Sequence, residues 1–463
     1  VSFTEGDDQR YSVPMMRIGR DLAETGDRST SPGVIAQLDD GALLIDAMSD
    51  DRGAAVVLGA ALRKRSRNSR HGGLQGRPRR GRIAGLADDP RRVNVLGVEQ
   101  SNSSAIIDGR LIAKLVRRLE AGTNPDVELP THLLSTGFER VRGVAATLDV
   151  ALAREPAPAN VVVVHDMVAH ESDLWVKMLD ELGLAIDHVL ASDDRSDDVI
   201  ATDIAELVGH RTAELHRALA QPGTAPTSGR GSDASMAPES FTLLWQRSIL
   251  QSLRTSIRST QRDLRRARRG GQLDEQTSEH ADRLAGRLDE LMEHFERLRQ
   301  QKLDAQRIRV HGDLHLGQIL WTGHDIVFID FEGEPGAPMA QRRIKRSPLA
   351  DVAGLLRSFD YAGRVAVHTA VERGRVHDLD DLGAWRERWT RQNQDALLDS
   401  YFEHMDGSNL IPSEDQDRRL LVGIYAATKA LYEVRYELAN RPEWATWPMT
   451  AIDAMLPESG AGQ

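Results

Sequence analysis

The stretches Arg309-Val-His-Gly-Asp-Leu-His-Leu-Gly-Gln318 and Asp325-Ile-Val-Phe-Ile-Asp-Phe-Glu-Gly-Glu334 decide what this sequence folds into. In the first stretch, apolar residues lead into a tight loop that holds Asp313, and Gln318 follows five positions later. Two short apolar segments separated by a Gly-His turn then predict a β-hairpin that ends at Asp330. We therefore expect the loop, the hairpin and Asp330 to lie close together in space.

These three side chains match the needs of phosphoryl transfer. Moving a phosphoryl group to an alcohol requires a carboxylate beside the attacking hydroxyl and oxygen ligands for Mg²⁺. Protein kinases place the catalytic Asp and a metal-binding Asn at D-x-x-x-x-N spacing, and a further Asp binds metal. Asp313 and Gln318 have this spacing, and Asp330 follows a predicted strand. We predict that Asp313 is the catalytic base and that Gln318 and Asp330 bind Mg²⁺.

A cation for the phosphates of ATP is expected at Lys114, which interrupts an apolar, strand-like run. Its acidic partner should come from the next helix, where Asp126 and Glu128 stand in the first turn; we place Glu128 in the nucleotide site. Ser101 and Ser103 belong to a small polar run that we expect to lie over the phosphates. The sequence contains neither G-x-G-x-x-G nor a P-loop motif, so a classical P-loop is not predicted.

These residues resemble the maltokinase family, which is distantly related to aminoglycoside phosphotransferases and shares the eukaryotic-like kinase fold. The resemblance extends over most of the chain, and residues 241 to 269 look most like the version fused behind trehalose synthase. The motifs that carry it are Leu96-Gly-Val-Glu-Gln-Ser-Asn-Ser-Ser104, Asn124-Pro-Asp126, Val310-His-Gly-Asp-Leu-His-Leu-Gly-Gln318, Ile329-Asp-Phe-Glu-Gly-Glu-Pro335, Arg346-Ser-Pro-Leu-Ala-Asp-Val-Ala-Gly-Leu-Leu-Arg-Ser-Phe359 and Lys429-Ala-Leu-Tyr-Glu-Val-Arg-Tyr-Glu437.

The resemblance implies further site residues. Met167 falls in the segment expected to bind adenine, and the sugar site is assigned to His311, Lys429, Tyr432 and Tyr436. Spacing supports the last three independently, because they fall on one face of a helix. Just ahead of Lys429, the sequence lacks the acidic residue that many members of the family carry.

The function implied is that of an ATP- and Mg²⁺-dependent sugar kinase that forms maltose 1-phosphate on a route toward α-glucan. One alternative is a related kinase that phosphorylates glucosamine or an aminoglycoside. A second alternative, from another class, is a nucleotide-binding module without turnover that serves a fused or associated trehalose synthase.

The predicted fold class is α+β, a bilobal protein-kinase-like fold. We expect a β-rich cap over residues 1–91, a small nucleotide-binding lobe over 92–168 and a mostly helical lobe over 169–463. A Pro-, Gly- and Ser-rich stretch at 221–233 predicts a linker. After it, apolar residues at helical spacing, from Phe241 and Leu244 to Ile257, predict a helix that pairs with a second one over 284–298.

Composition sets broad limits. The 463 residues include no Cys and no apolar run near the ~20 residues of a membrane span, and no signal peptide is visible. We therefore expect a cytoplasmic protein without disulfides or a membrane partner. Because the chain begins at Val1, we expect it to be a fragment of a longer protein.

The sequence argues against two other interpretations. His311 and His315 flank Asp313, as in some metal-dependent hydrolases, but the other histidines are scattered and the ligand count is too low. The basic residues between Arg63 and Arg82 have no interleaved aromatic residue, and the formal net charge is −11. Nucleic acid is therefore not an expected partner.

Overall fold

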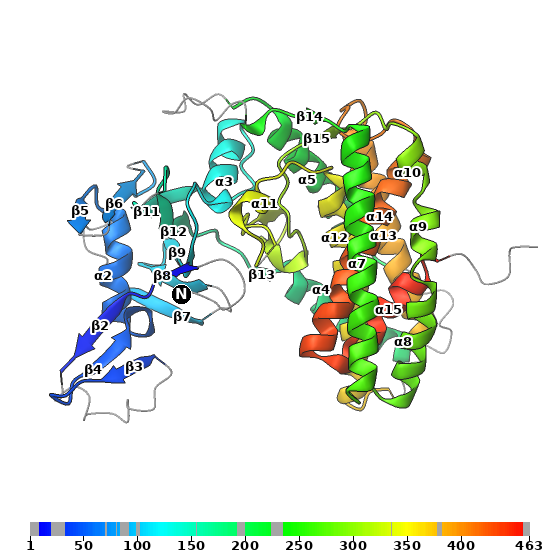
Figure 1. Cartoon of the computed structure of the whole chain (residues 1–463), viewed down its shortest axis with the longest axis horizontal. Helices are drawn as coiled ribbons and strands as arrows, with labels where there is room; N and C mark the ends of the chain where they lie inside the picture. The colour runs from blue at the N-terminus through cyan, green and yellow to red at the C-terminus, as the bar shows by residue number, and fades with distance from the viewer. Residues whose placement is uncertain are drawn as a thin grey trace, which may run out of the picture. The chain divides into compact units, whose positions relative to one another are not determined.

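The computed structural model describes residues 9–19, 33–69, 72–79, 81–83, 92–98, 102–153, 155–191, 200–223, 235–334, 336–376 and 382–456. The chain forms two compact units (Figure 1). The first unit joins residues 1–169 to residues 328–343, and the second joins residues 170–327 to residues 344–463. Strands dominate the first unit and helices the second, which confirms the predicted α+β class.

The first unit is built on a seven-stranded antiparallel sheet with the order β5-β6-β11-β12-β9-β8-β7. Its core is apolar because alternate residues of strands such as β9 point to the buried face, and helix α2 packs against that face. The bounds are β5 Ser66–Ser69, β6 Gly72–Pro78, β7 Val93–Val98, β8 Asn102–Ile107, β9 Leu111–Val116, β11 Val144–Val150, β12 Ala159–Asp166 and α2 Asp51–Leu62.

Smaller elements complete this unit. A three-stranded sheet has the order β2-β4-β3, and a two-stranded sheet pairs β1 with β10. Helix α3 begins after Asn124, whose side chain caps the N–H of Asp126. The bounds are β1 Arg10–Tyr11, β2 Met15–Ile18, β3 Val34–Gln37, β4 Leu43–Asp46, β10 Arg118–Leu119, the 3₁₀ helix η1 Ala47–Ser49, α3 Pro125–Ser135 and α11 Met339–Arg342.

The strands of the expected cap and of the expected nucleotide-binding lobe share one sheet, since β5 and β6 lie in the same sheet as β7 to β12. The basic segment between residues 63 and 82 supplies β5 and β6, and two of its arginines pair with acids of the sheet, Arg77 with Asp149 and Arg82 with Asp166. The three-part division at residues 91 and 168 stays a prediction.

The second unit is a stack of helices. Helix α7 packs on α14, α14 on α12, and α12 on α13, which packs on α5. The bounds are α4 Leu174–Ala191, α5 Asp203–Ala220, α7 Leu243–Arg269, α8 Glu275–Arg287, α9 Glu290–His294, α10 Arg297–Gln300, α12 Leu349–Glu372, α13 Gly383–Met405, α14 Asp415–Asn440, the 3₁₀ helix η4 Pro442–Trp444 and α15 Thr446–Asp453. None of the described helices has the length and apolar character to cross a membrane.

The predicted helical pair is present with two differences. Helix α7 continues to Arg269, and its partner is divided into α8, α9 and α10. Leu244 was expected in the apolar stripe, but its side chain is 78% exposed, because the stripe that packs against the unit begins at Ile249 and Leu250. Most of the expected linker at 221–233 lies outside the described residues.

The predicted hairpin is confirmed. Strands β16 (Ile319–Trp321) and β17 (Ile326–Phe328) pair, and β13 (Ser172–Asp173) completes a three-stranded sheet. The apolar residues before the loop are not a strand; β15 (Gln306–Arg307) ends just ahead of them and pairs with β14 (Glu239–Ser240). A 3₁₀ helix η2 (Leu316–Gln318) connects the loop to β16.

Helix α12 lies directly against the loop that holds Asp313. A Cβ atom added at Gly354 would lie 2.5 Å from the carbonyl oxygen of Leu314. This distance is far below an ordinary contact, so the close approach of loop and helix requires glycine at this position.

Replacing Gly354 with Ala should therefore destabilise the protein by about 1–3 kcal/mol, because the added methyl group must push the loop away. Urea unfolding followed by circular dichroism would measure the change. The matched control is Gly183→Ala in α4, where an added Cβ meets no atom within 4 Å and helix propensity should give a gain of roughly 0.5–1 kcal/mol. Equal effects at both positions would contradict the steric argument.

Candidate active site

Lys114 is the centre of an ionic cluster in the first unit. It lies on β9, between β8 and β12, and its side chain is 15% exposed. Its Nζ donates to Oδ1 of Asp330 at 2.7 Å and lies 3.2 Å from Oε1 of Glu332. Asp330 has a positive φ of 62°, a conformation that costs energy in a residue with a side chain and that is frequent at functional sites.

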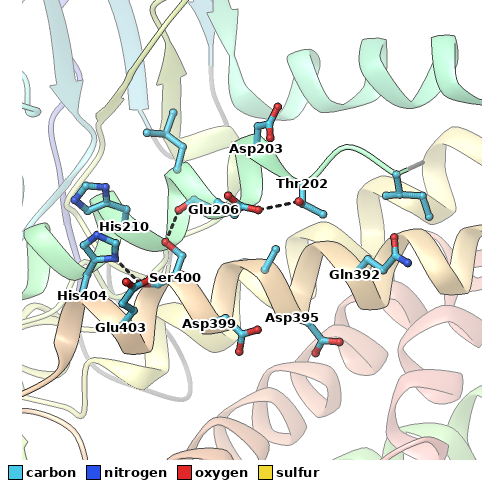
Figure 2. Close-up of a pocket in the computed structure, with 13 residues that line it drawn as sticks. Thr202, Asp203, Glu206, His210, Gln392, Asp395, Asp399, Ser400, Glu403 and His404 are labelled. Atoms are coloured by element: carbon cyan, nitrogen blue, oxygen red, sulfur yellow. Dashed lines mark hydrogen bonds between the residues drawn. The ribbon is translucent and has the colours of Figure 1, made fainter. Parts of the chain in front are cut away.

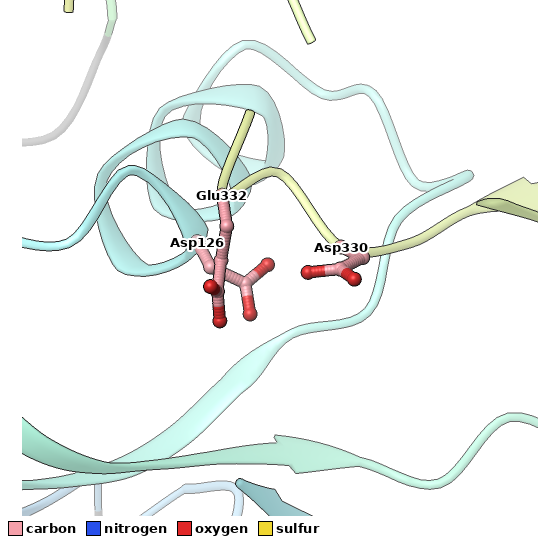
Figure 3. Close-up of side chains that lie close together, drawn as sticks. All are labelled: Asp126, Asp330 and Glu332. Carbon is pink, nitrogen blue, oxygen red and sulfur yellow. The ribbon is translucent and has the colours of Figure 1, made fainter. Parts of the chain in front are cut away.

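Asp126 is the third carboxylate of this cluster. Its Oδ1 accepts the backbone N–H of Phe331 at 2.9 Å, and its Oδ2 lies 2.9 Å from Nε2 of His165. Asp126 thus ties α3 to the segment that carries Asp330 and Glu332. Figure 3 shows the three carboxylates turned toward one another, with ligand atoms within 4.8 Å of each other.

The charges in this cluster change its pKa values. Burial alone would lower the pKa of Lys114, but the carboxylates of Asp330, Glu332 and Asp126 outweigh it and raise that pKa well above its usual value. Burial would likewise raise the pKa of Asp126, yet His165, Lys114 and the Phe331 N–H hold it below its usual range. Burial raises the pKa of Glu332, Lys114 opposes this, and the two neighbouring acids add to it. Lys114 is therefore an ammonium at neutral pH.

The donor set fits a hard divalent cation. Mg²⁺ prefers carboxylate and amide oxygens, and three carboxylates converge here with limited exposure. Burial is the main cause of the raised pKa of Glu332 and the neighbouring acids add to it, so a bound cation would offset the charge of these carboxylates. Asp330 and Glu332 could hold Mg²⁺ together with water and phosphate oxygens.

The other predicted nucleotide-binding residues lie as follows. Glu128 pairs with Arg343 at 2.7 Å, whereas Asp126 and Glu332 are the acids next to Lys114 besides Asp330. Ser103 is not in a loop; it is a buried residue of β8 whose hydroxyl accepts two bonds from the Arg117 guanidinium. Met167 follows β12, and its N–H donates to the carbonyl of Arg110. Ser101 lies outside the described residues.

A buried carboxylate of α12 fixes the loop of Asp313 in the second unit. Asp351 accepts the N–H of His311 at 2.8 Å and that of Gly312 at 2.9 Å. Nε2 of His216 lies 3.2 Å from Asp351, and Nδ1 of His216 lies 2.8 Å from the hydroxyl of Tyr401. Burial would raise the pKa of Asp351, but His216, the charge of His311 and the loop N–H groups lower it. Asp351 therefore remains an anion that holds two successive backbone amides.

Lys429 of α14 is in contact with the predicted base. Its Nζ lies 3.1 Å from Oδ1 of Asp313 and 5.4 Å from the ring of Tyr432, which stacks on Tyr436. The predicted helical face of Lys429, Tyr432 and Tyr436 therefore exists in the structure, and it adjoins the loop. The next acid on this face, Glu433, is bound by the Arg357 guanidinium at 2.7 Å.

Two further predicted residues, His311 and Gln318, lie in or next to the loop of Asp313. His311 is buried, with 1% of the residue exposed, and both its backbone N–H and the charge of its imidazole act on Asp351. Gln318 ends η2, and its N–H donates to the carbonyl of His315. Asp313 and Gln318 belong to the second unit and Asp330 to the first, so the chain passes between units within the predicted constellation.

Sequence reasoning missed three residues that the structure brings to these sites. Glu332 stands two residues after Asp330 in the same motif, so an acid on both sides of Phe331 was an available signal. His165 lies in a strand, and nothing in its neighbourhood marks it as the partner of Asp126. Asp351 lies within the segment 346–359, and the sign of its role in the sequence was that it is a charged residue in an otherwise apolar helix.

Replacing Asp351 with Asn should remove a pH-dependent contribution to stability. The folded-state pKa of Asp351 is depressed, so its contribution is present above the unfolded pKa of about 3.9 and is lost as pH falls through the folded value. The free energy of unfolding, measured by urea titration from about pH 3 to 7, should rise more steeply with pH in wild type than in the variant. Parallel curves would contradict an ionised Asp351; Asp415→Asn, an exposed acid, is the control.

Comparisons with known proteins show the family of the chain. The model of the family described as "Phosphotransferase enzyme family" (APH) matches residues 132–388, more than half of the chain. A "Glucosamine kinase" of Streptacidiphilus jiangxiensis is 27% identical over 369 residues, which cover 78% of this chain and 73% of the relative. A second "Glucosamine kinase", from Mycolicibacterium smegmatis, is 26% identical over 372 residues, 78% of this chain and 79% of the relative.

Among solved structures, a glucosamine kinase in complex with glucosamine, ADP and inorganic phosphate is similar in fold, with a TM-score of 0.61 and 20% identity. The similarity covers 97% of this chain and 88% of that one. The comparisons confirm the expected phosphotransferase family and the kinase-like fold. They do not confirm the resemblance to maltokinases in particular, because these relatives carry the name glucosamine kinase. The chain belongs to the phosphotransferase enzyme family.

Proposed function

We propose that this protein is an ATP- and Mg²⁺-dependent sugar kinase, and that its acceptor is a neutral sugar such as maltose, phosphorylated at the anomeric hydroxyl. The observation that carries the proposal is the Asp313 carboxylate, held on a loop that Asp351 fixes and contacted at 3.1 Å by Lys429. A fixed carboxylate beside a helix face of two tyrosines and a lysine suits a polyhydroxylated ring.

Asp313 would act as the base. Its carboxylate would accept the proton of the sugar hydroxyl while that oxygen attacks the γ-phosphorus of ATP, with ADP as the leaving group. An anomeric hydroxyl is more acidic than an ordinary alcohol, so a carboxylate base suffices. Lys429 would orient one oxygen of Asp313 and leave the other for the substrate.

Lys114 would bind the phosphates of the nucleotide. Its ammonium is held in place by Asp330 and Glu332, and its raised pKa keeps it charged. Gln318 and Asp330 would be the metal ligands, with Glu332 near enough to Asp330 to join them. When bound, Mg²⁺ supplies positive charge that offsets the phosphate oxygens.

The charges around Asp313 favour a neutral acceptor over an amino sugar. Lys429 places an ammonium next to the base, and a second ammonium on the sugar would be repelled by it. The two acids on the same stretch of α14 are already bound, Glu433 by Arg357 and Glu437 by Tyr361 and Arg441. Neither is available to receive a sugar ammonium without losing a partner.

Glucosamine is the second candidate, because the two curated relatives carry that name and match more than two thirds of this chain. An aminoglycoside acceptor and a nucleotide-binding module without turnover remain the further alternatives. Association or fusion with a trehalose synthase would supply maltose directly, and it is proposed here on the sequence resemblance of residues 241–269 alone.

Replacing Asp313 with Ala should lower turnover by about 10³-fold or more, because base catalysis and substrate positioning are lost together. A coupled ADP-release assay with ATP, Mg²⁺ and maltose measures this change. Asp415→Ala removes an exposed acid of the same helical unit and should leave turnover unchanged. Activity retained in the Asp313 variant would exclude this residue as the base, and ATP binding without turnover on any sugar would favour the binding module.

Reversing the charge of Lys429 tests the choice of acceptor. In wild type, kcat/KM should be higher for maltose than for glucose, glucosamine or kanamycin. In Lys429→Glu, the ratio of kcat/KM for glucosamine to that for maltose should rise by about 10-fold, since an acid now faces the sugar ammonium. Lys302→Glu makes the same charge change at an exposed position and should not alter the ratio. A wild-type preference for glucosamine would overturn the neutral-sugar proposal and keep the kinase.

A further inference from the structure

Helix α7 carries a row of exposed arginines. At 3.6 residues per turn, six of them fall within an arc of about 80° and extend over about 33 Å of the helix. All six are exposed. This arginine row consists of Arg247, Arg254, Arg258, Arg262, Arg265 and Arg269.

The row is not neutralised within the part of the chain that the structure describes. No carboxylate pairs with any of its members there; the side-chain bonds they make are from Arg254 to Gln251 and from Arg262 to Ser259. Like charges four residues apart destabilise a helix, and Arg254, Arg258 and Arg262 form two such pairs in succession. An ordinary solvated helix face alternates acids and bases instead.

The opposite face of α7 holds the helix against the rest of the unit, and the arginines are not needed for this packing. Its buried residues pack against α14 and α8 and belong to the core of the second unit. They are mainly apolar and include Ile249, Leu250, Leu253, Ile257 and Leu264.

A groove between α5 and α13 has the opposite charge. Its volume is about 820 Å³, and five exposed carboxylates line it. Figure 2 shows Asp395, Asp399 and Glu403 following one another along α13, with Asp203 and Glu206 on α5. None of the three α13 acids is ion-paired in the described structure, although Arg419 lies near enough to Asp399 and Asp395 to feel their charge.

The two charged rows have the same spacing. Asp395, Asp399 and Glu403 stand four residues apart, as do Arg254, Arg258 and Arg262, so each row rises by about 6 Å per charge. Helices α14 and α12 lie between α7 and α13 in the packing order, so the rows cannot meet within one molecule. We propose that the arginine row of one copy docks into the α5–α13 groove of a second copy, in a head-to-tail contact.

Nucleic acids and anionic membranes fit the arginine row less well than the acidic groove does. Exposed side chains between the arginines are Ser, Thr and Gln, and no aromatic residue of the row's arc offers a stacking surface for bases. An anionic membrane surface would need apolar side chains all along the arginines, but between Arg247 and Arg269 the apolar residues of α7 are buried, and the exposed Leu244 stands alone ahead of the row. The contact is electrostatic and unites two different surfaces, so it gives a ring or an open chain of subunits.

Sedimentation velocity of the full chain at rising protein concentration tests this proposal. At about 50 mM NaCl the mean mass should rise above that of the monomer with concentration, and at about 500 mM NaCl it should return to the monomer value. Arg258→Glu/Arg262→Glu and Asp395→Lys/Asp399→Lys should each weaken the association by at least about 10-fold. An equimolar mixture of the two variants should associate again, because each supplies one altered surface and one intact surface.

The control for the arginine reversal is Arg92→Glu/Arg373→Glu, which makes the same change in net charge at two exposed arginines outside the row. Circular dichroism of every variant establishes that it is folded before its mass is compared. A wild-type protein that stays monomeric at low salt overturns the proposal. So does association that survives either reversal, or that is lost equally in the control, or that the mixture fails to recover.

Discussion

The two hydrogen bonds that Asp351 accepts from successive backbone amides are the constraint on which the loop of Asp313 depends. The side chain of Asp313, which we propose as the base, has a fixed position only if its backbone is held, and a buried carboxylate that accepts two N–H bonds holds it strongly. The carboxylate is in turn fixed by His216, and His216 by Tyr401, so α5, α12 and α13 all contribute to the position of one loop. Gly354 lets α12 come close enough for these bonds to form.

The first unit holds the ammonium of Lys114 in a largely buried position. Lys114 tolerates burial because acids from two distant parts of the chain surround it. Burial raises the pKa of Glu332, and repulsion from Asp330 and Asp126 adds to this effect. The three carboxylates of the cluster outnumber the one ammonium of Lys114, so added positive charge would be favourable there. The arrangement therefore suits a ligand that brings its own cation.

The sequence allowed the fold class, the hairpin and the start of α7 to be predicted, because each depends on local spacing. It did not allow the partner of Lys114 to be chosen between Asp126 and Glu128, since both stand in the first turn of α3 and only tertiary packing turns one of them inward. Leu244 was misplaced for the same reason: apolar periodicity predicts a face, but contacts decide where the covered face begins. The pairing of His165 with Asp126 joins residues 39 positions apart and leaves no local pattern.

The first unit is assembled from two separate stretches of chain. Lys114 and Asp330 are 216 positions apart, and the second unit's residues 170–327 intervene. During synthesis, which proceeds from the N-terminus, the sheet that carries Lys114 leaves the ribosome long before Asp330 and Glu332 do. Until the chain has grown past Glu332, Asp126 alone of the three carboxylates is present to offset the charge of Lys114. Completion of the first unit therefore requires that residues 170–327 of the second unit have already been synthesised.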